Sequence, residues 1–201
     1  MFVQIVRARV ADAAAVHAAH DRWFAELAAG APGWLGTTAG VSGDGDFIRL
    51  ARFESQAVAE HIASRPEQVD WWAQTAELFT GEVSVTGSSA AYLDRGGASP
   101  EARFVQVIQR RVRDLSRARQ ILKEISPLVA QVRPEDIGTL IVEHDGDRFT
   151  VAVYFTCEHE ARGTERAPAP ALRALREEQN ALGVEPPRFY DLRQPWHYPP
   201  R

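Results

Sequence analysis

The sequence predicts an α+β fold built from two ferredoxin-like units in tandem, and two observations support that prediction. The first is an internal repeat, because the front half aligns with the back half without a gap at an offset of 102 residues. The second is the order of elements expected in each copy: strand, helix, strand, strand, helix, strand. This order is typical of helices covering one face of an antiparallel sheet. The matched pairs include Phe2/Phe104, Asp12/Asp114, Gly36/Gly138, Phe53/Phe155 and Gly81/Gly183.

The first copy begins with residues 2–10, whose β-branched side chains predict a strand. Asp12 follows at the position of a helix N-cap, and the periodic apolar residues after it predict a helix over 13–29. Ser42-Gly43-Asp44-Gly45 is a hairpin signal between two strands. The elements expected around it are strands over 35–41 and 46–53, helices over 56–63 and 66–79, and a strand over 82–93 that follows the helix-ending Gly81.

The second copy predicts the same elements in the same order. They are a strand over 103–111, a helix over 114–131, strands over 137–143 and 148–155, a helix over 157–181 with a break, and a strand over 187–192. We therefore expect unit 1 over 1–95, a linker over 96–102, and unit 2 over 103–201. The last unit includes a C-terminal arm, because its proline-rich end also carries Trp196 and Tyr198, which a free solvated tail rarely does.

In each unit the sheet has one face without helices, yet both faces are apolar. Phe47 and Phe53 share one face of a strand, while Ile48 and Leu50 lie on the other. An apolar sheet face must be buried against something. We expect the two sheets of this chain to pack against each other as a pseudo-dimeric α/β barrel, and further homo-oligomerisation stays open.

Composition excludes several classes of protein. The net charge is −4, which gives no basic footprint for nucleic acid. No run of 18 apolar residues is present, so no membrane span is expected. The start of the chain has no basic segment followed by a long apolar core, so we expect no signal peptide and a cytoplasmic location. Cys157 is the only cysteine, which excludes intrachain disulfides and a cysteine-built zinc site.

Two segments of the first copy resemble the antibiotic-biosynthesis-monooxygenase-like family of dimeric α/β-barrel proteins. They are Pro32-Gly33-Trp34-Leu35-Gly36, before the second strand, and Phe53-Glu54-Ser55, which opens a helix. The second copy keeps the frame but departs from both motifs. Single-unit members of that family pair as homodimers, so the resemblance implies that this chain is a fused pseudo-dimer.

The resemblance implies a small-molecule-binding protein similar to cofactor-independent monooxygenases that act on aromatic compounds. Fold alone does not fix the activity, so two alternatives stay open. One is a non-catalytic module that binds a metabolite or a protein. The other is a haem binder that uses one of His17, His20 or His61. The first interpretation needs no cofactor and no metal, and the residues that the haem-degrading branch uses are replaced here.

Positions where the two copies disagree are the candidates for a ligand site. Arg52 aligns with Tyr154, and Trp71 aligns with Arg173 at the offset of 102. An arginine on an apolar face needs a partner, either an internal carboxylate or an anionic or phenolic ligand. We expect a planar or anionic small molecule between the second helix and the sheet of unit 1. The predicted lining residues are Trp71, Trp72, Arg52 and Trp34, with His61 as the candidate base.

Three further features have simpler interpretations beside the functional ones. His17 and His20 share a helix face and could supply two metal ligands, but no third ligand stands out, which favours a polar helix face. Cys157 occupies a helix start, where a thiol is more reactive or simply caps the helix. Arg49 raises the same question as Arg52 on the opposite face, and the matched Gln4 and Gln106 favour a structural hydrogen bond between the units.

Overall fold

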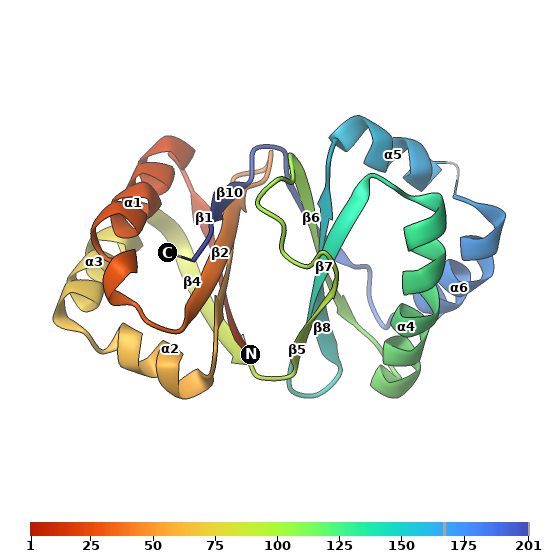
Figure 1. Ribbon diagram of the computed structural model, residues 1–201, viewed down its shortest axis with the longest axis horizontal. Helices are drawn as coiled ribbons and strands as arrows, with labels where there is room; N and C mark the ends of the chain where they lie inside the picture. The colour runs from red at the N-terminus through yellow and green to blue at the C-terminus, as the bar shows by residue number, and fades with distance from the viewer. Residues whose placement is uncertain (167, 201) are drawn as a thin grey trace. The chain divides into compact units, whose positions relative to one another are not determined.

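The computed structural model describes residues 1–166 and 168–200, which form two compact units. Unit 1 comprises Met1–Ala91 and Gln194–Arg201, and unit 2 comprises Tyr92–Arg193. Each unit has a five-stranded antiparallel sheet with helices on one face (Figure 1). The predicted α+β class and the tandem ferredoxin-like units are thereby confirmed.

Unit 1 has the strand order β10-β2-β3-β1-β4. Helices α1, α2 and α3 cover one face of this sheet (Figure 1). Its elements are β1 (Phe2–Val10), α1 (Ala13–Glu26), the 3₁₀ turn η1 (Ala28–Gly30), β2 (Trp34–Val41), β3 (Asp46–Phe53), α2 (Gln56–Ala63), α3 (Pro66–Ala76), β4 (Phe79–Ser88) and β10 (Trp196–Tyr198).

Unit 2 has the strand order β5-β7-β8-β6-β9, and α4, α5 and α6 cover one face of its sheet. Its elements are β5 (Ala91–Arg95), β6 (Phe104–Arg111), α4 (Leu115–Val132), β7 (Asp136–Glu143), β8 (Arg148–Phe155), α5 (Glu158–Arg166), α6 (Pro170–Ala181) and β9 (Arg188–Leu192).

Side-chain caps fix the starts of three helices where the sequence places them. Asp12 accepts hydrogen bonds from the backbone N–H groups of Ala14 and Ala15, at 2.9 and 3.0 Å. Ser55 accepts from the N–H of Val58, and Asp114 caps α4 in the same way. These bonds satisfy N–H groups that have no partner within the helix. The predicted caps at Asp12 and Ser55 are confirmed.

The segment after α3 differs from the prediction. The helix ends at Ala76, and Gly81 lies inside β4 with φ +75° instead of ending the helix. The pairing of β1 with β4 shifts register in the same place, between Arg7 and Arg9, which indicates a β-bulge. The positive φ explains why glycine occupies this position.

The expected strand over 82–93 is two strands that belong to different sheets. β4 ends at Ser88 in the sheet of unit 1, whereas β5 is an edge strand beside β7 in the sheet of unit 2. The C-terminal arm makes the reciprocal addition, since β10 pairs with β2 at the edge of the unit 1 sheet. The boundary expected at residue 95 therefore falls at 91, and the arm belongs to unit 1.

The offset between the two copies grows from 102 to 104 along the chain. Early strands keep 102, because Phe2 pairs with Phe53 and Phe104 pairs with Phe155. Later elements follow 104: Pro66 and Pro170 both open a helix, and Val3 pairs with Ser88 where Val105 pairs with Leu192. The second copy thus carries two extra residues before α6.

This shift corrects one predicted equivalence. At an offset of 104, Trp71 corresponds to Leu175 and not to Arg173, and Trp72 corresponds to Arg176. Arg173 is exposed, whereas Arg176 is partly buried. The gap-free alignment could not reveal this, because it carries the earlier offset past the insertion.

Candidate functional site

Unit 2 contains a cavity of about 660 Å³ between its sheet and the helices α4 and α6. This volume lies within the range of roughly 300–1,000 Å³ that is usual for small-molecule sites. The sheet side is mainly apolar, with Ile108, Ile141, Phe149, Val151 and Val153. Charged and amide side chains lie at the other walls, so the cavity combines an apolar floor with a few polar groups.

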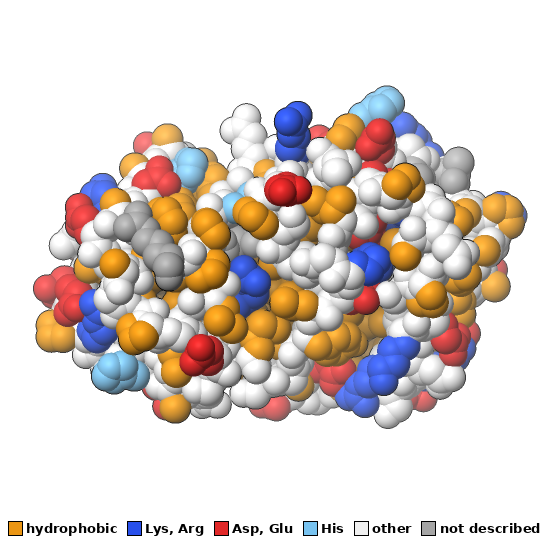
Figure 2. All heavy atoms as spheres, in the orientation of Figure 1, with side chains coloured by type: hydrophobic (Ala, Val, Ile, Leu, Met, Phe, Trp, Pro, Cys, Tyr) orange, Lys and Arg blue, Asp and Glu red, His pale blue; other side chains and the backbone are white. Residues whose placement is uncertain are grey.

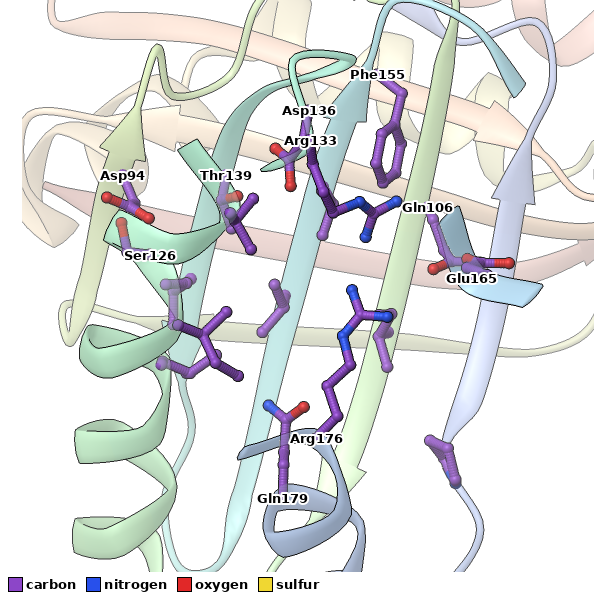
Figure 3. A pocket seen from close by; sticks show the side chains of 18 of the residues that line it. Asp94, Gln106, Ser126, Arg133, Asp136, Thr139, Phe155, Glu165, Arg176 and Gln179 are labelled. Atoms are coloured by element: carbon purple, nitrogen blue, oxygen red, sulfur yellow. The ribbon is translucent and has the colours of Figure 1, made fainter. Parts of the chain in front are cut away.

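Two guanidinium groups approach each other inside the cavity (Figure 3). Arg133, from the segment after α4, is buried; its Nε donates to Glu135 at 3.0 Å, and it lies over the ring of Phe155. Arg176 extends from α6 toward Arg133 and makes no ion pair with any described residue. Burial lowers the pKa of Arg176, and the charge of Arg133 lowers it further.

The carboxylates that line the cavity are already paired with other arginines. Asp136 accepts from Arg95 at 2.6 Å, and Asp94 from the same guanidinium at 3.0 Å. Arg162 is paired with Glu165 at 2.8 Å and also with Asp191. Arg176 therefore makes no direct ion pair among the residues that the structure describes, although the more distant charges of Glu165, Asp136 and Glu135 act on it.

A second lining arginine has only a neutral partner. Arg110 on β6 donates to the amide oxygen of Asn180 at 3.1 Å, and burial lowers its pKa. An arginine that is removed from water without an opposite charge is costly, and an anion would relieve that cost. With Arg176, the cavity thus holds two arginines that lack an anionic partner in the described structure.

One end of the cavity is built by the edge strand β5. Arg95 at the end of this strand donates to Asp136 and to Thr139, both at 2.6 Å. Its backbone has φ 54°, which is uncommon for a residue with a side chain. Burial raises the pKa of Asp136, while Arg95 opposes that change. A carboxylate whose pKa is raised holds a proton more strongly than an exposed one, which makes it a better proton acceptor.

Aromatic side chains fill the corresponding space in unit 1, where a cavity of only about 50 Å³ remains. Trp23 and Phe24 of α1 pack on Trp34, with ring centroids 4.9 and 6.2 Å apart. The residues of unit 2 at the same positions, Ile125 and Ser126, are much smaller and line the large cavity. Side-chain size at matched positions therefore decides which unit is hollow.

The residues predicted as a ligand site do not all come together. Trp71 and Trp34 are buried and line the small cavity of unit 1. Trp72 lies beside Trp71 and packs on Phe79 at 6.1 Å, outside the cavity lining. His61 is exposed on α2 and lies outside both cavities.

Arg52 is the second predicted residue outside both cavities. A β-carbon on Gly36 would lie 2.6 Å from a guanidinium nitrogen of Arg52, so this side chain crosses the neighbouring strand at its glycine. The arginine that lines the small cavity is Arg49, three residues earlier on β3 and therefore on the opposite face of the sheet from Arg52. Its guanidinium donates to Gln4 at 2.7 Å, so Gln4 bonds within unit 1 rather than between the units.

The sequence interpretation missed Arg176, Arg133 and Arg95. An alignment that allowed for the two-residue insertion would have revealed Arg176, because it matches Arg176 with Trp72. Arg133 aligns with Ala31 at the offset of 102, which was an available signal of lost symmetry. Arg95 carried no such signal, because only the strand exchange moves it into unit 2.

Several alternatives receive no support from the described residues. Among residues 1–166 and 168–200, no group of three histidine, cysteine or acidic side chains could hold a metal ion. His17 instead stacks on Trp196 at 4.3 Å, and His20 is buried in the core of unit 1. Cys157 is a free, partly exposed thiol. Over the described part of the chain, each helix is too short or too polar to cross a membrane.

Charge is also mixed on the surface. On the side of each unit shown in Figure 2, basic and acidic side chains are interspersed.

Solved structures match nearly the whole chain, whereas no family model and no curated protein matches the sequence. Two of them are named "putative monooxygenase". The one from Fusobacterium nucleatum subsp. nucleatum has a TM-score of 0.78 at 8% identity, covering 98% of this chain and 94% of its own. The one from Lactobacillus acidophilus has a TM-score of 0.73 at 11% identity, covering 95% and 92%.

A third match is an anthrone oxidase-like protein, with a TM-score of 0.65 at 12% identity, covering 98% of this chain and 93% of the other. At these identities the likeness is one of fold. The chain shares a monooxygenase-like fold with these proteins along nearly its full length, and the predicted resemblance is confirmed at that level.

Proposed function

We propose that the cavity of unit 2 binds a small, largely apolar and planar molecule that carries one acidic oxygen. The observation that carries this proposal is the unpaired guanidinium of Arg176, which points into a cavity of about 660 Å³ beside Arg133. An anionic oxygen between the two guanidinium groups would form the direct ion pair that no described carboxylate makes with Arg176. Such charge-assisted hydrogen bonds are the strongest that side chains form.

For the reaction, we propose cofactor-independent oxygenation of an aromatic compound related to the anthrones. Two arginines beside a phenol or enol lower its pKa and stabilise the resulting anion. Asp136 is the buried carboxylate that we assign as proton acceptor, and burial raises its pKa. The electron-rich anion then reduces dioxygen: a ring methylene becomes a carbonyl, one oxygen atom is retained, and the other leaves as water.

This reaction balances without an added reductant. Conversion of a methylene group to a carbonyl releases four electrons, and dioxygen takes up four. The apolar sheet residues keep water away from the reactive anion. The fold that the chain shares with an anthrone oxidase-like protein supports the choice of substrate class.

The two alternatives differ in what the cavity supplies. A non-catalytic module would bind the same anion without turnover, and the same arginines would serve it. A haem site needs an axial ligand, but no histidine, cysteine, methionine or tyrosine is among the described residues that line this cavity. The geometry therefore favours an acidic aromatic ligand over haem.

The test uses 1,8-dihydroxyanthrone with the full-length protein, and it measures both binding and oxygen uptake above the uncatalysed rate. We expect Arg176→Met to weaken binding by about tenfold or more, because a hydrogen bond to a charged group is lost. Arg173→Met is the matched control, since Arg173 lies on the same helix but is exposed and outside the cavity. Asp136→Asn should retain binding and lower turnover.

Each outcome decides between the functions. Binding that requires Arg176 but produces no quinone would replace the oxygenase with the non-catalytic module. Equal losses in Arg176→Met and Arg173→Met, or no binding by the native protein, would overturn the proposed site.

A further inference from the structure

The small cavity of unit 1 contains two buried nitrogen atoms without partners. These are Nε2 of His20 and Nε of Arg49, neither of which forms a hydrogen bond with any described residue. Both residues line the cavity, and His20 is only 4% exposed. A buried polar atom without a partner is rare in folded proteins and indicates a missing ligand or water.

Other polar groups around this cavity are already engaged. The indole N–H groups of Trp34 and Trp71 donate to Thr37 at 3.1 Å and to the carbonyl oxygen of Ala19 at 2.8 Å. The hydroxyl of Tyr198 donates to Asp21 at 2.8 Å. The buried atoms of this cavity that a ligand could still bind are therefore those of His20 and Arg49.

His20 offers an acceptor to this cavity. Its Nδ1 lies 2.8 Å from the carbonyl oxygen of Val16, which can only accept, so Nδ1 carries the proton. Burial, helped by the charge of Arg49, lowers the pKa of His20 to about 3, so the ring is neutral at pH 7. Nε2 then presents a lone pair and requires a hydrogen-bond donor.

Arg49 offers a donor and an uncompensated positive charge. Its guanidinium lies over the rings of Trp71 and Trp72, at 5.8 and 5.7 Å from the centroids, and donates to the neutral amide of Gln4. Burial lowers the pKa of Arg49 to about 10, so it remains charged at pH 7. Among the described residues it has no carboxylate partner, and an anion in the cavity would supply the missing charge.

We propose that this cavity binds bicarbonate, a small oxyanion that carries one O–H group. Its O–H donates to Nε2 of His20, and its negatively charged oxygens accept from Arg49. Size agrees with this choice: a water molecule needs roughly 10–15 Å³ of such space, and the cavity of about 50 Å³ accepts the four heavy atoms of bicarbonate. The site is separate from the cavity of unit 2 and does not depend on its function.

The O–H group gives the site its selectivity. Formate and nitrate have similar size and charge but no hydrogen to donate to Nε2, and chloride likewise lacks one. The groups that bear on His20 besides Arg49 are His17 and Asp21 of α1, with the hydroxyl of Tyr198 held on Asp21. None of these supplies a donor to Nε2.

The experiment is calorimetric titration of the full-length protein at pH 8 with sodium bicarbonate, formate or nitrate, at one ionic strength set with sodium chloride. We expect saturable binding of bicarbonate that is at least about tenfold tighter than that of formate or nitrate, the value of one good hydrogen bond. His20→Leu takes the residue found at the matched position of unit 2, Leu122, and should make the three anions bind equally weakly.

Arg49→Met should abolish binding of all three anions, while Arg22→Met, an exposed arginine on α1, should leave binding unchanged. Circular dichroism verifies that each variant is folded. If Arg49→Met does not fold, the selectivity of the native protein and of His20→Leu decides the question. Equal or non-saturable responses to the three anions by the native protein would show that the cavity holds water only and would overturn the proposal.

Discussion

Unit 1 and unit 2 share one frame but use their interiors differently. In unit 1, aromatic rings occupy the space between sheet and helices and leave about 50 Å³. In unit 2, smaller aliphatic residues and arginines at matched positions leave about 660 Å³. All five tryptophans of the chain, at positions 23, 34, 71, 72 and 196, belong to unit 1. The comparison teaches that two copies with the same backbone arrangement can differ in their interiors: side chains fill that of unit 1 and leave a cavity in that of unit 2.

The exchanged edge strands reinforce this difference. In unit 1 the arm strand β10 inserts Trp196 and Tyr198 into the aromatic core, and Tyr198 lies opposite Thr37. In unit 2 the corresponding edge strand β5 brings Arg95 to Thr139, the counterpart of Thr37. The same architectural position thus adds an apolar filler to one unit and a charged group to the other.

Exchanging one matched residue should have the largest effect. Trp23→Ile gives unit 1 the residue of unit 2, and we expect it to lower the free energy of unfolding by about 3 kcal/mol, because a cavity replaces a packed indole. Ile125→Trp makes the reverse change and should narrow the unit 2 cavity, weakening ligand binding with little loss of stability. Urea unfolding and titration with 1,8-dihydroxyanthrone measure the two effects. Equal destabilisation by both changes would break the comparison between a packed and a hollow unit.

The pH dependence of the free energy of unfolding should test whether His20 is neutral and buried in the folded protein. Its pKa is about 3 in the folded protein against about 6.5 when unfolded, so the unfolded chain binds more protons between these values. Stability is therefore lost as the pH falls below 6.5, by about 2 kcal/mol at pH 5. His20→Leu should remove this loss, while the exposed His61→Gln should retain it. Tryptophan fluorescence during urea unfolding at pH 7 and pH 5 reports on unit 1 alone, because unit 1 holds all the tryptophans. If the free energy of unfolding changed equally between the two pH values in the native protein and in His20→Leu, the low pKa assigned to His20 would be contradicted.

The smallest expected effect concerns the anchoring of the arm. Tyr198→Phe removes the hydroxyl that donates to Asp21 at 2.8 Å but keeps the ring in the core. We expect a loss of about 1 kcal/mol in the free energy of unfolding, the usual value of one hydrogen bond. Chemical unfolding followed by tryptophan fluorescence provides the measurement. A loss several times larger would mean that Asp21 orders the whole arm and not just one ring.

The order of helices and strands could be predicted from the sequence because it depends on local signals. Asp12 and Ser55 cap helices, hairpin turns separate strands, and the alternation of Phe47 with Ile48 assigns faces of the sheet. Sequence reasoning did not single out the arginines that line the two cavities, for two reasons. It chose Arg52, whereas Arg49 lines the small cavity, and it carried the offset of 102 past an insertion, so it paired Trp71 with Arg173 and did not consider Arg176.

The sequence by itself determined the two units, their class and the order of their elements, because helix caps, turns and periodicity act over a few residues. Only the tertiary structure decided which unit is hollow, since that depends on the summed volumes of side chains from distant helices and strands. It also decided where β5 and β10 add to a sheet, because an edge can pair with any strand that reaches it. Only the structure shows that Arg176 and Arg49 line cavities without forming an ion pair with any described carboxylate.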